Sequence, residues 1–559
     1  MASNNLAASD SAEHVESEMA SIISPQERRR EALARIDDAK FGWHHVRAVV
    51  VAGVGFFTDS YDIFAINLVV GMLGVVYWQG AHSSSGKIPS SSDTAIKVAT
   101  SGGTVIGQLF SDGWPIELVA SASLTSSSPG MSITGLLIFW RVIMGIGIGG
   151  DYPLSSIITS EFATTKWRGA MMGAVFAMQG IGQFAAAIVA LIVTAGFRES
   201  LESAKDVAHC TGVCLLAVDK MWRTVIGFGA VPACAALYYR MTIPETPRYT
   251  FDVERDIIKA DEDIRAYIKG HPEGHPDEIQ RIRVLRNESI EFLAPKASWS
   301  DFWHHFGNWK NGSVLLGTAG SWFFLDIAFY GLGLNNSIIL SAIGWTGGKN
   351  VYETFYRNAV GNLILIVAGA IPGYWVTVAT VDTIGRKPIQ IAGFAILTIL
   401  FFVIGGAYNQ LKHSHNGLLG LYILAQFFFN FGPNATTFIV PGECFPTRYR
   451  STSHGVSAAS GKVGAIIAQC VFGPLVHRGA KAGSSDSPWL NHVMEIFGGF
   501  MFCGLLTSLL IPETKRLTLE QLSGEHHVDP QQDQTQDQEK TNENSTPKEP
   551  ATTTLQGGS

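Results

Sequence analysis

The sequence predicts an all-helical, multi-pass membrane protein built from two related helical bundles. Its composition is 47% hydrophobic and only 16% charged, which is unusual for a soluble globular domain. Long apolar stretches recur along the chain, separated by short polar breaks. Landmark residues of the first half return in the second half at one constant spacing, so that Glu161 corresponds to Glu443 and Arg168 to Arg450.

The apolar stretches are long enough to be transmembrane helices. An apolar helix of about 20 residues crosses the roughly 30 Å hydrocarbon core of a bilayer. Lipid offers the backbone no hydrogen-bond partner, so each crossing segment must be helical. A further stretch at 96–124 is apolar but interrupted. The ten clear predicted spans are 48–74, 133–158, 170–195, 222–242, 312–334, 358–380, 388–408, 417–440, 453–476 and 491–511.

Polar segments frame the two bundles and predict the orientation. Lys and Arg gather before the first span and in alternate loops, which places those loops and both termini in the cytoplasm. Two bundles joined by a polar loop are the plan of a carrier in which one bundle rocks against the other. The predicted organisation is an N-terminal tail at 1–45, a bundle at 46–242, a central loop at 243–310, a second bundle at 311–512 and a mostly disordered C-terminal tail at 513–559.

The first bundle is short of sequence. The interval from Asp59 to Asp151 is about 15 residues shorter than the matching interval from Asp326 to Pro433. The shortfall falls at about 105–125, where two apolar pieces at 98–110 and 115–124 are each too short to span a bilayer. We expect either a re-entrant hairpin or a gene model that has lost most of its third helix.

Charge and cysteine content exclude other classes of protein. The formal net charge of -7 comes largely from the acidic C-terminal tail, so no surface for nucleic acid is predicted. Cys210 and Cys214 are close enough in sequence to form a disulfide in a short external loop, but we expect all six cysteines to be unpaired thiols. The sequence contains no P-loop, no metal-ligand cluster and no nucleophile with a convincing base, so neither a cofactor nor an enzyme is expected.

Charged residues inside apolar spans are costly, and each is a functional hypothesis. A carboxylate in a desolvated cavity can take up and release protons near neutral pH, as a proton-driven carrier requires. Structural ion pairs, Arg141 with Asp151 or Asp326 with Lys462, are the alternative explanation. The residues concerned are Asp59, Asp62, Arg141, Asp151, Asp326 and Lys462.

Aromatic and amide side chains accompany these charges. Trp322 and Tyr330 lie four positions on either side of Asp326, so the three can share one face of a helix. Tyr152 and Asn434 occupy equivalent positions of the two halves. With Gln179 and Lys462, these groups are the donors that a compact oxyanion needs, although ordinary interhelical hydrogen bonding explains any single one equally well.

Several motifs resemble a known family. GGDYPLSSIITSEF at 149–162, DTIGRKP at 382–388, the PETPR start of the central loop, SWFFLDIAFYG and the long segment 427–455 are similar to the phosphate:proton symporters of fungi and plants. These belong to the major facilitator superfamily, whose fold is two six-helix bundles. GRK and PETPR are shared with sugar carriers of the superfamily, whereas GGDYPLS, SWFFLDIAFYG and NFGPN are more specific to phosphate. The resemblance runs from about Phe41 to Leu522.

The resemblance implies roles for individual residues. Phosphate would bind between the halves, with Asp326 as its proton acceptor and Lys462 as the charge partner of Asp326. The first-half copy of the gating loop is absent from this chain, at the place where the sequence is short. The implied phosphate site is Tyr152, Gln179, Trp322, Asp326, Tyr330, Asn434 and Lys462; the implied proton-coupling set is Asp59, Asp62, Arg141, Asp151 and Asp326; the implied gating loop is Asp382, Gly385, Arg386 and Lys387.

The sequence therefore predicts a carrier that imports inorganic phosphate with protons by alternating access, in the plasma membrane. A sugar or organic-ion carrier of the same superfamily and a phosphate sensor that signals through its polar segments are the alternatives. Sugar sites favour amides and few buried charges, which speaks against the first. The oligomeric state and the selectivity among anions stay open.

Overall fold

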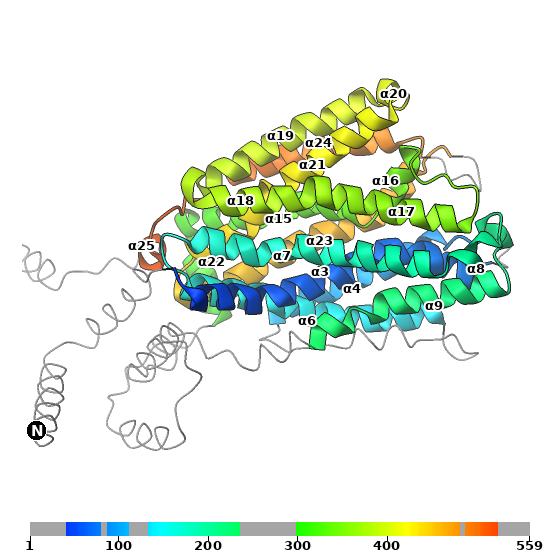
Figure 1. Cartoon of the computed structure of the whole chain (residues 1–559). Coiled ribbons are helices and arrows are strands. Elements are labelled where there is room, and N and C mark those ends of the chain that lie inside the picture. Colours follow the sequence, from blue (N-terminus) through cyan, green and yellow to red (C-terminus); the bar gives the residue numbers. More distant parts are fainter. Residues whose placement is uncertain (1–40, 80–85, 111–131, 235–297, 481–486, 524–559) are drawn as a thin grey trace, which may run out of the picture.

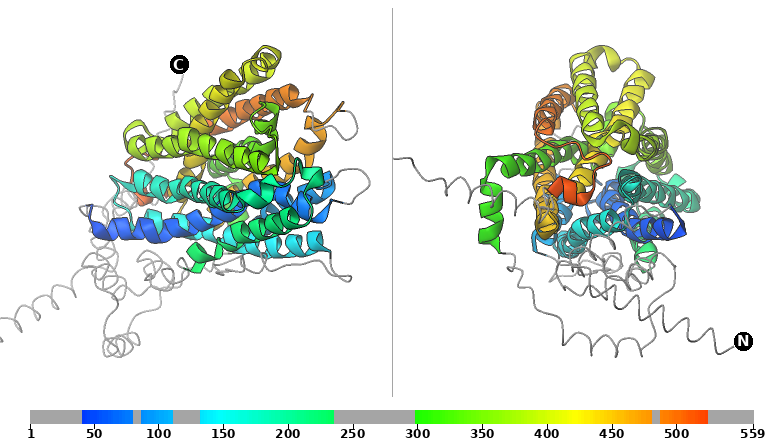
Figure 2. Two further views of the ribbon diagram at one scale, coloured as in Figure 1. Left: turned by 45° about the vertical axis from the view of Figure 1, so that its right-hand side comes forward. Right: turned by 90° about the vertical axis from the view of Figure 1, so that its left-hand side faces the viewer.

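The computed structural model describes residues 41–79, 86–110, 132–234, 298–480 and 487–523, and the regular secondary structure within them is all helical. The helices run side by side in two groups (Figure 1). Most helices of the second half, coloured green to orange, lie above those of the first half, coloured blue to cyan-green, while α22 (Pro433–Cys444) and α23 (Thr447–Val476) lie among the first-half helices. The two views of Figure 2 show the same separation, and its right-hand panel looks along the helices from one end.

The described part of the first half consists of four long helices and three shorter elements. They are α3 (Trp43–Tyr77), α4 (Ser90–Phe110), α6 (Ile133–Phe162), α7 (Arg168–Gly196), α8 (Arg198–Glu202), the 3-10 helix η1 (Val207–His209) and α9 (Val213–Gly227).

The second half begins with a short amphipathic helix and contains a matching bundle. Its elements are α14 (Trp299–Gly307), α15 (Trp309–Gly333), α16 (Asn336–Ala342), α17 (Val351–Leu365), the π-helical turn η4 (Ile366–Ala370), α18 (Ile371–Ile384), α19 (Arg386–Gly406), α20 (Tyr408–Leu411), α21 (His415–Asn430), α22 (Pro433–Cys444), α23 (Thr447–Val476), α24 (Leu490–Ser508) and α25 (Leu519–Ser523).

Among the described residues, eight helical segments are long and apolar enough to cross a membrane. They account for eight of the ten predicted spans. One of them, Val351–Ile384, is continuous across α17, η4 and α18. The predicted span 222–242 is described only in part: α9 ends at Gly227, and 235–242 lies outside the described residues.

The predicted span 417–440 is not one continuous helix in the structure. The structure divides this range into α21 and α22, with the break at Phe431 and Gly432. Pro433 is the first residue of α22, and its ring nitrogen has no N–H to continue the hydrogen-bond ladder from α21. A hydropathy window averages over such a break, so the apolar pattern alone does not reveal it.

The short region of the first half is described only as far as Phe110. The apolar piece 98–110 belongs to one continuous helix, α4, which begins at Ser90. Residues 111–131, including the second piece at 115–124, lie outside the described residues, so the choice between a hairpin and a damaged gene model is untested.

Glycine allows α4 to pack closely on α6. A Cβ at Gly103 would lie 2.1 Å from the carbonyl oxygen of Val142, and a Cβ at Gly145 would lie 2.3 Å from that of Thr100. Small residues let helix backbones approach where a larger side chain would hold them apart. This contact fixes α4 at the boundary with the second half, where it also packs on α23.

The two ends of the bundle have different chemistry. Arg168, Arg386 and Arg450 lie at one end, called here the arginine end, which is on the left in Figure 1 beside α25. At the other end, called the disulfide end, Cys210 and Cys214 form a disulfide between η1 and α9. The expectation of unpaired thiols was therefore wrong for this pair, because the turn after η1 brings the two Cα atoms to 5.2 Å.

Candidate functional site

A buried ion pair lies at the boundary between the halves. The Nζ atom of Lys462 on α23 is 2.9 Å from an oxygen of Asp326 on α15. It also donates to the hydroxyl of Tyr330 at 3.1 Å. Lys462 and Asp326 are 2% and 1% exposed, so their charges are compensated by each other rather than by water.

Residues of the first half complete the surroundings of Lys462. Its ammonium lies 5.2 Å from the ring centre of Tyr152 on α6 and 4.2 Å from that of Tyr330. Gln179 on α7 donates to the Tyr152 hydroxyl at 2.8 Å. The pair formed in the second half therefore faces a phenol and an amide of the first half.

Tyr374 on α18, which was not singled out from the sequence, connects Asn434 to this cluster. Its hydroxyl donates to Gln179 at 3.3 Å and accepts from Asn434 on α22 at 2.8 Å. Asn434 also donates to Asn430 at 2.7 Å. A tyrosine in an apolar stretch is the only sequence signal that pointed to Tyr374, and such tyrosines are common in helical membrane proteins.

Trp322 closes one side of this network. Its ring centre lies 6.4 Å from that of Tyr152 and 5.5 Å from that of His454 on α23. His454 is fully buried, its Nε2 lies 3.3 Å from the carbonyl oxygen of Phe438, and sequence reasoning did not single it out. The structure thus brings all seven residues of the expected phosphate site into one connected, buried cluster.

The residues expected to couple protons occupy two places. Asp59 on α3 interacts electrostatically with Tyr152 and Tyr330. Asp62 interacts with Arg141 instead. Its carboxylate also packs against Gly229, where an added Cβ would lie only 2.2 Å from the Asp62 Oδ1 atom. The two aspartates are both buried, but they have different partners.

The alternative structural pair of Arg141 with Asp151 does not form. Both lie on α6, and their separation of ten residues corresponds to about 15 Å along a helix. Arg141 instead donates from Nε to the carbonyl oxygen of Ile96 on α4 at 2.9 Å, and Asp151 accepts from Ser155 at 2.8 Å.

The expected gating loop joins the halves at the arginine end. The carboxylate of Asp382, at the end of α18, accepts from the backbone N–H groups of Gly169 and Ala170 at 3.2 and 2.7 Å. These donors are in the first turn of α7, where unpaired N–H groups and the helix dipole favour an anion. Arg450 adds a second cross-half contact, 3.4 Å from Glu161.

Arg386 orients this carboxylate from within the second half. It lies 2.9 Å from Asp382 and makes a two-pronged contact to Glu443, at 3.0 and 2.7 Å. Gly385 precedes it with a φ of 111°, and a Cβ there would lie 2.6 Å from Glu513. Glu513 in turn accepts from the backbone N–H groups of Arg386 and Lys387.

The halves also meet at the disulfide end. Asn67 on α3 donates to Asn362 on α17 at 3.0 Å and accepts from Ser337 on α16 at 3.1 Å. Lys97 on α4 donates to Asn335, which precedes α16, at 2.8 Å. Contacts between the halves are therefore present at both ends of the described structure, and the ion pair lies between them.

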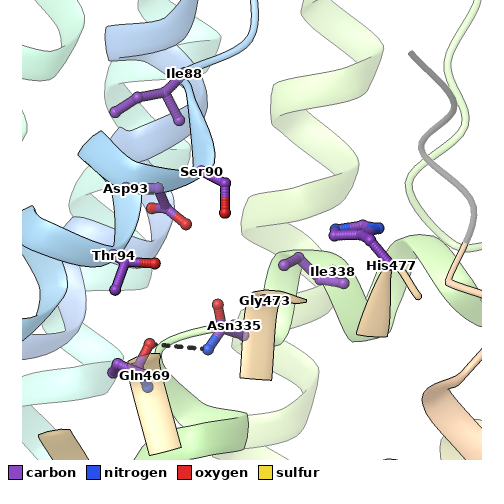
Figure 3. A pocket seen from close by; sticks show the side chains of 9 residues that line it. All are labelled: Ile88, Ser90, Asp93, Thr94, Asn335, Ile338, Gln469, Gly473 and His477. Atoms are coloured by element: carbon purple, nitrogen blue, oxygen red, sulfur yellow. Dashed lines mark hydrogen bonds between the residues drawn. The ribbon is translucent and has the colours of Figure 1, made fainter. Parts of the chain in front are cut away.

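A cavity of about 140 Å³ lies at the disulfide end between α4, α16 and α23 (Figure 3). Hydroxyl, carboxylate, amide and imidazole side chains line most of it. Its lining is Ile88, Ser90, Asp93, Thr94, Asn335, Ile338, Gln469, Gly473 and His477.

Comparisons with known proteins agree with this architecture. Residues 48–525 match the family model described as sugar (and other) transporter. The chain is 62% identical over 522 residues to the repressible high-affinity phosphate permease of Neurospora crassa, with 90% of each chain covered. It is 54% identical over 540 residues to the inorganic phosphate transporter PHO84 of Saccharomyces cerevisiae, covering 92% of this chain and 90% of the relative. Inorganic phosphate transporter 1-2 of Oryza sativa is 39% identical, with 89% and 97% covered.

Solved structures of a more distant transporter share the fold. The proton:xylose symporter XylE bound to 6-bromo-6-deoxy-D-glucose superposes with a TM-score of 0.58 at 20% identity, over 86% of this chain and 98% of that one. The partially occluded inward-open XylE of E. coli gives 0.57 at 18% identity, over 85% and 99%. The protein is thus a multi-pass integral membrane transporter and not an enzyme. The chain belongs to the fungal and plant inorganic phosphate transporter family of the major facilitator superfamily.

Proposed function

We propose that this protein imports inorganic phosphate together with protons. The observation that carries the proposal is the buried pair of Lys462 and Asp326, surrounded by hydroxyl, indole and amide donors from both halves. A phosphate oxyanion matches such a set of donors and can replace Asp326 as the counter-charge of the ammonium, which a neutral sugar cannot do. The names of the relatives, two of them fungal phosphate carriers, support the same substrate.

The geometry supplies a reason for proton coupling. In this structure the ammonium of Lys462 is neutralised by Asp326 at 2.9 Å. An arriving anion needs that positive charge and is repelled by the carboxylate. A proton on Asp326 removes the repulsion and turns the side chain into a hydrogen-bond donor. Loss of the proton restores the ion pair and expels the anion.

The contacts between the halves at both ends support alternating access. The arginine end would be cytoplasmic, as expected from its basic residues, and both termini would lie on that side. Opening outward requires separating Lys97 from Asn335 and Asn67 from Asn362. Opening inward requires separating Asp382 from α7 and Arg450 from Glu161. Asp59, Asp62 and Asp151 would then carry the proton between the site and the aqueous phases, and Arg141 would act through its charge on Asp62.

The test is uptake of radiolabelled phosphate at external pH 5 and pH 8, in cells that lack their own phosphate carriers. Surface labelling would confirm that the chain reaches the plasma membrane. We expect uptake that is faster at pH 5, that stops when the proton gradient is collapsed, and that excess glucose or xylose leaves unchanged. Asp326→Asn should abolish the dependence on pH while the chain still reaches the surface.

Two results would count against the proposal. Competition by a sugar would assign the site to a sugar carrier. Absence of uptake by a surface-expressed chain, with phosphate-dependent signalling retained, would indicate a sensor or a carrier disabled by its short third-helix region.

A further inference from the structure

We propose that the cavity at the disulfide end is an entry station, where an external oxyanion binds to Lys97 before it reaches Lys462. This inference rests on the proposed transport of phosphate and adds a second binding site to it. Lys97 has no part in the central cluster, yet it is a buried cation, 4% exposed, at the boundary between the halves. A buried lysine is costly unless its charge has a use or a partner.

Lys97 does not itself line the cavity, but both of its hydrogen-bond partners, Asp93 and Asn335, do. Its Nζ lies 2.8 Å from Asp93, one helical turn earlier on α4, and 2.8 Å from the amide oxygen of Asn335 in the other half. The second contact must break when the halves separate at this end. An outward opening therefore releases the ammonium from Asn335 toward the entering solute.

The cavity continues toward the central site through two amides. Asn335 donates to Gln469 at 3.1 Å, the contact drawn in Figure 3, and Gln469 donates to the backbone oxygen of Tyr330 at 2.7 Å. Tyr330 itself contacts Lys462. Gln469 and Lys462 are seven residues apart on α23, which corresponds to roughly 10 Å along the helix. The cavity therefore lies about two helical turns from Lys462, on the side of the disulfide end.

The lining suits a hydrated anion that has not yet lost its water. A volume of about 140 Å³ exceeds the roughly 30 Å³ that one water occupies in the liquid, so an oxyanion with part of its hydration shell fits. Ser90 and Thr94 add hydroxyl donors to the ammonium. One carboxylate oxygen of Asp93 has no hydrogen-bond partner among the described residues. Asp93 thus opposes the anion and limits how tightly the station holds it.

Substitutions of Lys97 and Asp93, which both lie on α4, should change the KM for phosphate uptake in opposite directions. Lys97→Gln removes the attracting charge and should raise the KM for phosphate uptake about tenfold, with the maximal rate within about twofold of wild type. Asp93→Asn removes the opposing charge and should lower the KM severalfold. Lys97→Arg keeps the charge and should restore most of the affinity. Lys349→Gln, an exposed lysine in the segment between α16 and α17, is the matched control and should change nothing.

The opposite signs separate an entry station from a structural contact. If the Asp93, Lys97 and Asn335 network only held the halves together, both substitutions would break it and shift the KM in the same direction, which would overturn the proposal. Loss of pH-dependent uptake in Asp93→Asn would assign the cavity to protons and also overturn it. Should Lys97→Gln fail to reach the surface, a raised KM in Asp93→Asn is sufficient to reject the idea.

Binding to the purified full chain distinguishes failure of this inference from failure of the proposed function. Radiolabelled phosphate is titrated onto wild type, Lys97→Gln and Asp93→Asn. A wild type that binds but does not transport contradicts the transport function, and the order of the three affinities then tests Lys97. A wild type that neither binds nor transports phosphate contradicts both.

Discussion

Asp382 is predicted to hold the arginine end closed, and its removal should open that end. Its carboxylate accepts two backbone hydrogen bonds from the first turn of α7, at 3.2 and 2.7 Å. Hydrogen bonds to a charged group contribute about 1.5–3 kcal/mol each, and the carboxylate regains part of this from water when the end opens. We therefore expect Asp382→Ala to destabilise the closed form of the arginine end by about 2–3 kcal/mol. This corresponds to a roughly 30- to 150-fold shift toward the open form.

A thiol introduced on α6 reports the opening. Ser156 on α6 is fully buried and faces α22 of the other half, since a Cβ at Gly442 would lie 2.3 Å from its hydroxyl oxygen. Ser156→Cys would be made after replacing the free thiols Cys234, Cys444, Cys470 and Cys503, with the disulfide retained. A membrane-permeant maleimide should then label the Ser156→Cys protein at least about tenfold faster when Asp382→Ala is added.

The control is Asp301→Ala, which removes a half-exposed carboxylate paired with Arg448 inside the second half. It should leave the labelling rate unchanged. An unchanged rate in Asp382→Ala, from a chain that keeps its unfolding temperature, would refute the assignment of Asp382 to a gate.

Three further outcomes are expected. Tyr374→Phe removes the hydroxyl that joins Gln179 to Asn434 and should cost about 1–2 kcal/mol of phosphate affinity, seen as a roughly five- to thirtyfold higher KM without a change in surface expression. Gly385→Ala places a Cβ at a φ of 111° and against Glu513, so thermal unfolding should show a loss of about 1–3 kcal/mol, whereas Gly406→Ala, with open space around it, should show none. Mass spectrometry of unreduced peptides should find Cys210 joined to Cys214, and Cys214→Ser should lower stability by about 2 kcal/mol because the closed loop is short.

The sequence predicted much of the central cluster because its signals are local. Asp326, Trp322 and Tyr330 share a helical face through their spacing of four. Tyr152 and Asn434 were found through the repeat, since equivalent positions of two related bundles face each other across the same axis. Buried charges stand out in any apolar stretch, which is why Lys462 and Asp59 were identified without a structure.

Other features depend on contacts between distant segments. Tyr374 and Lys97 are single polar residues whose importance comes from partners in the opposite half, Gln179 and Asn335. Asp59 and Asp62 are three residues apart on α3, yet Asp59 interacts electrostatically with Tyr152 and Asp62 with Arg141. The packing of α9 and α6 against α3 makes that distinction.

Hydropathy along the chain was enough to specify the membrane class and the identity of the charged residues, because these signals act within a single helix, and the repeat between the halves specified the two-bundle plan. The place where α21 gives way to α22, the pairing of the cysteines and the side chains that meet across the halves became known from the folded arrangement alone. Those outcomes depend on how rigid helices pack against one another. A pattern along one helix specifies which face is buried, but not which partner that face meets.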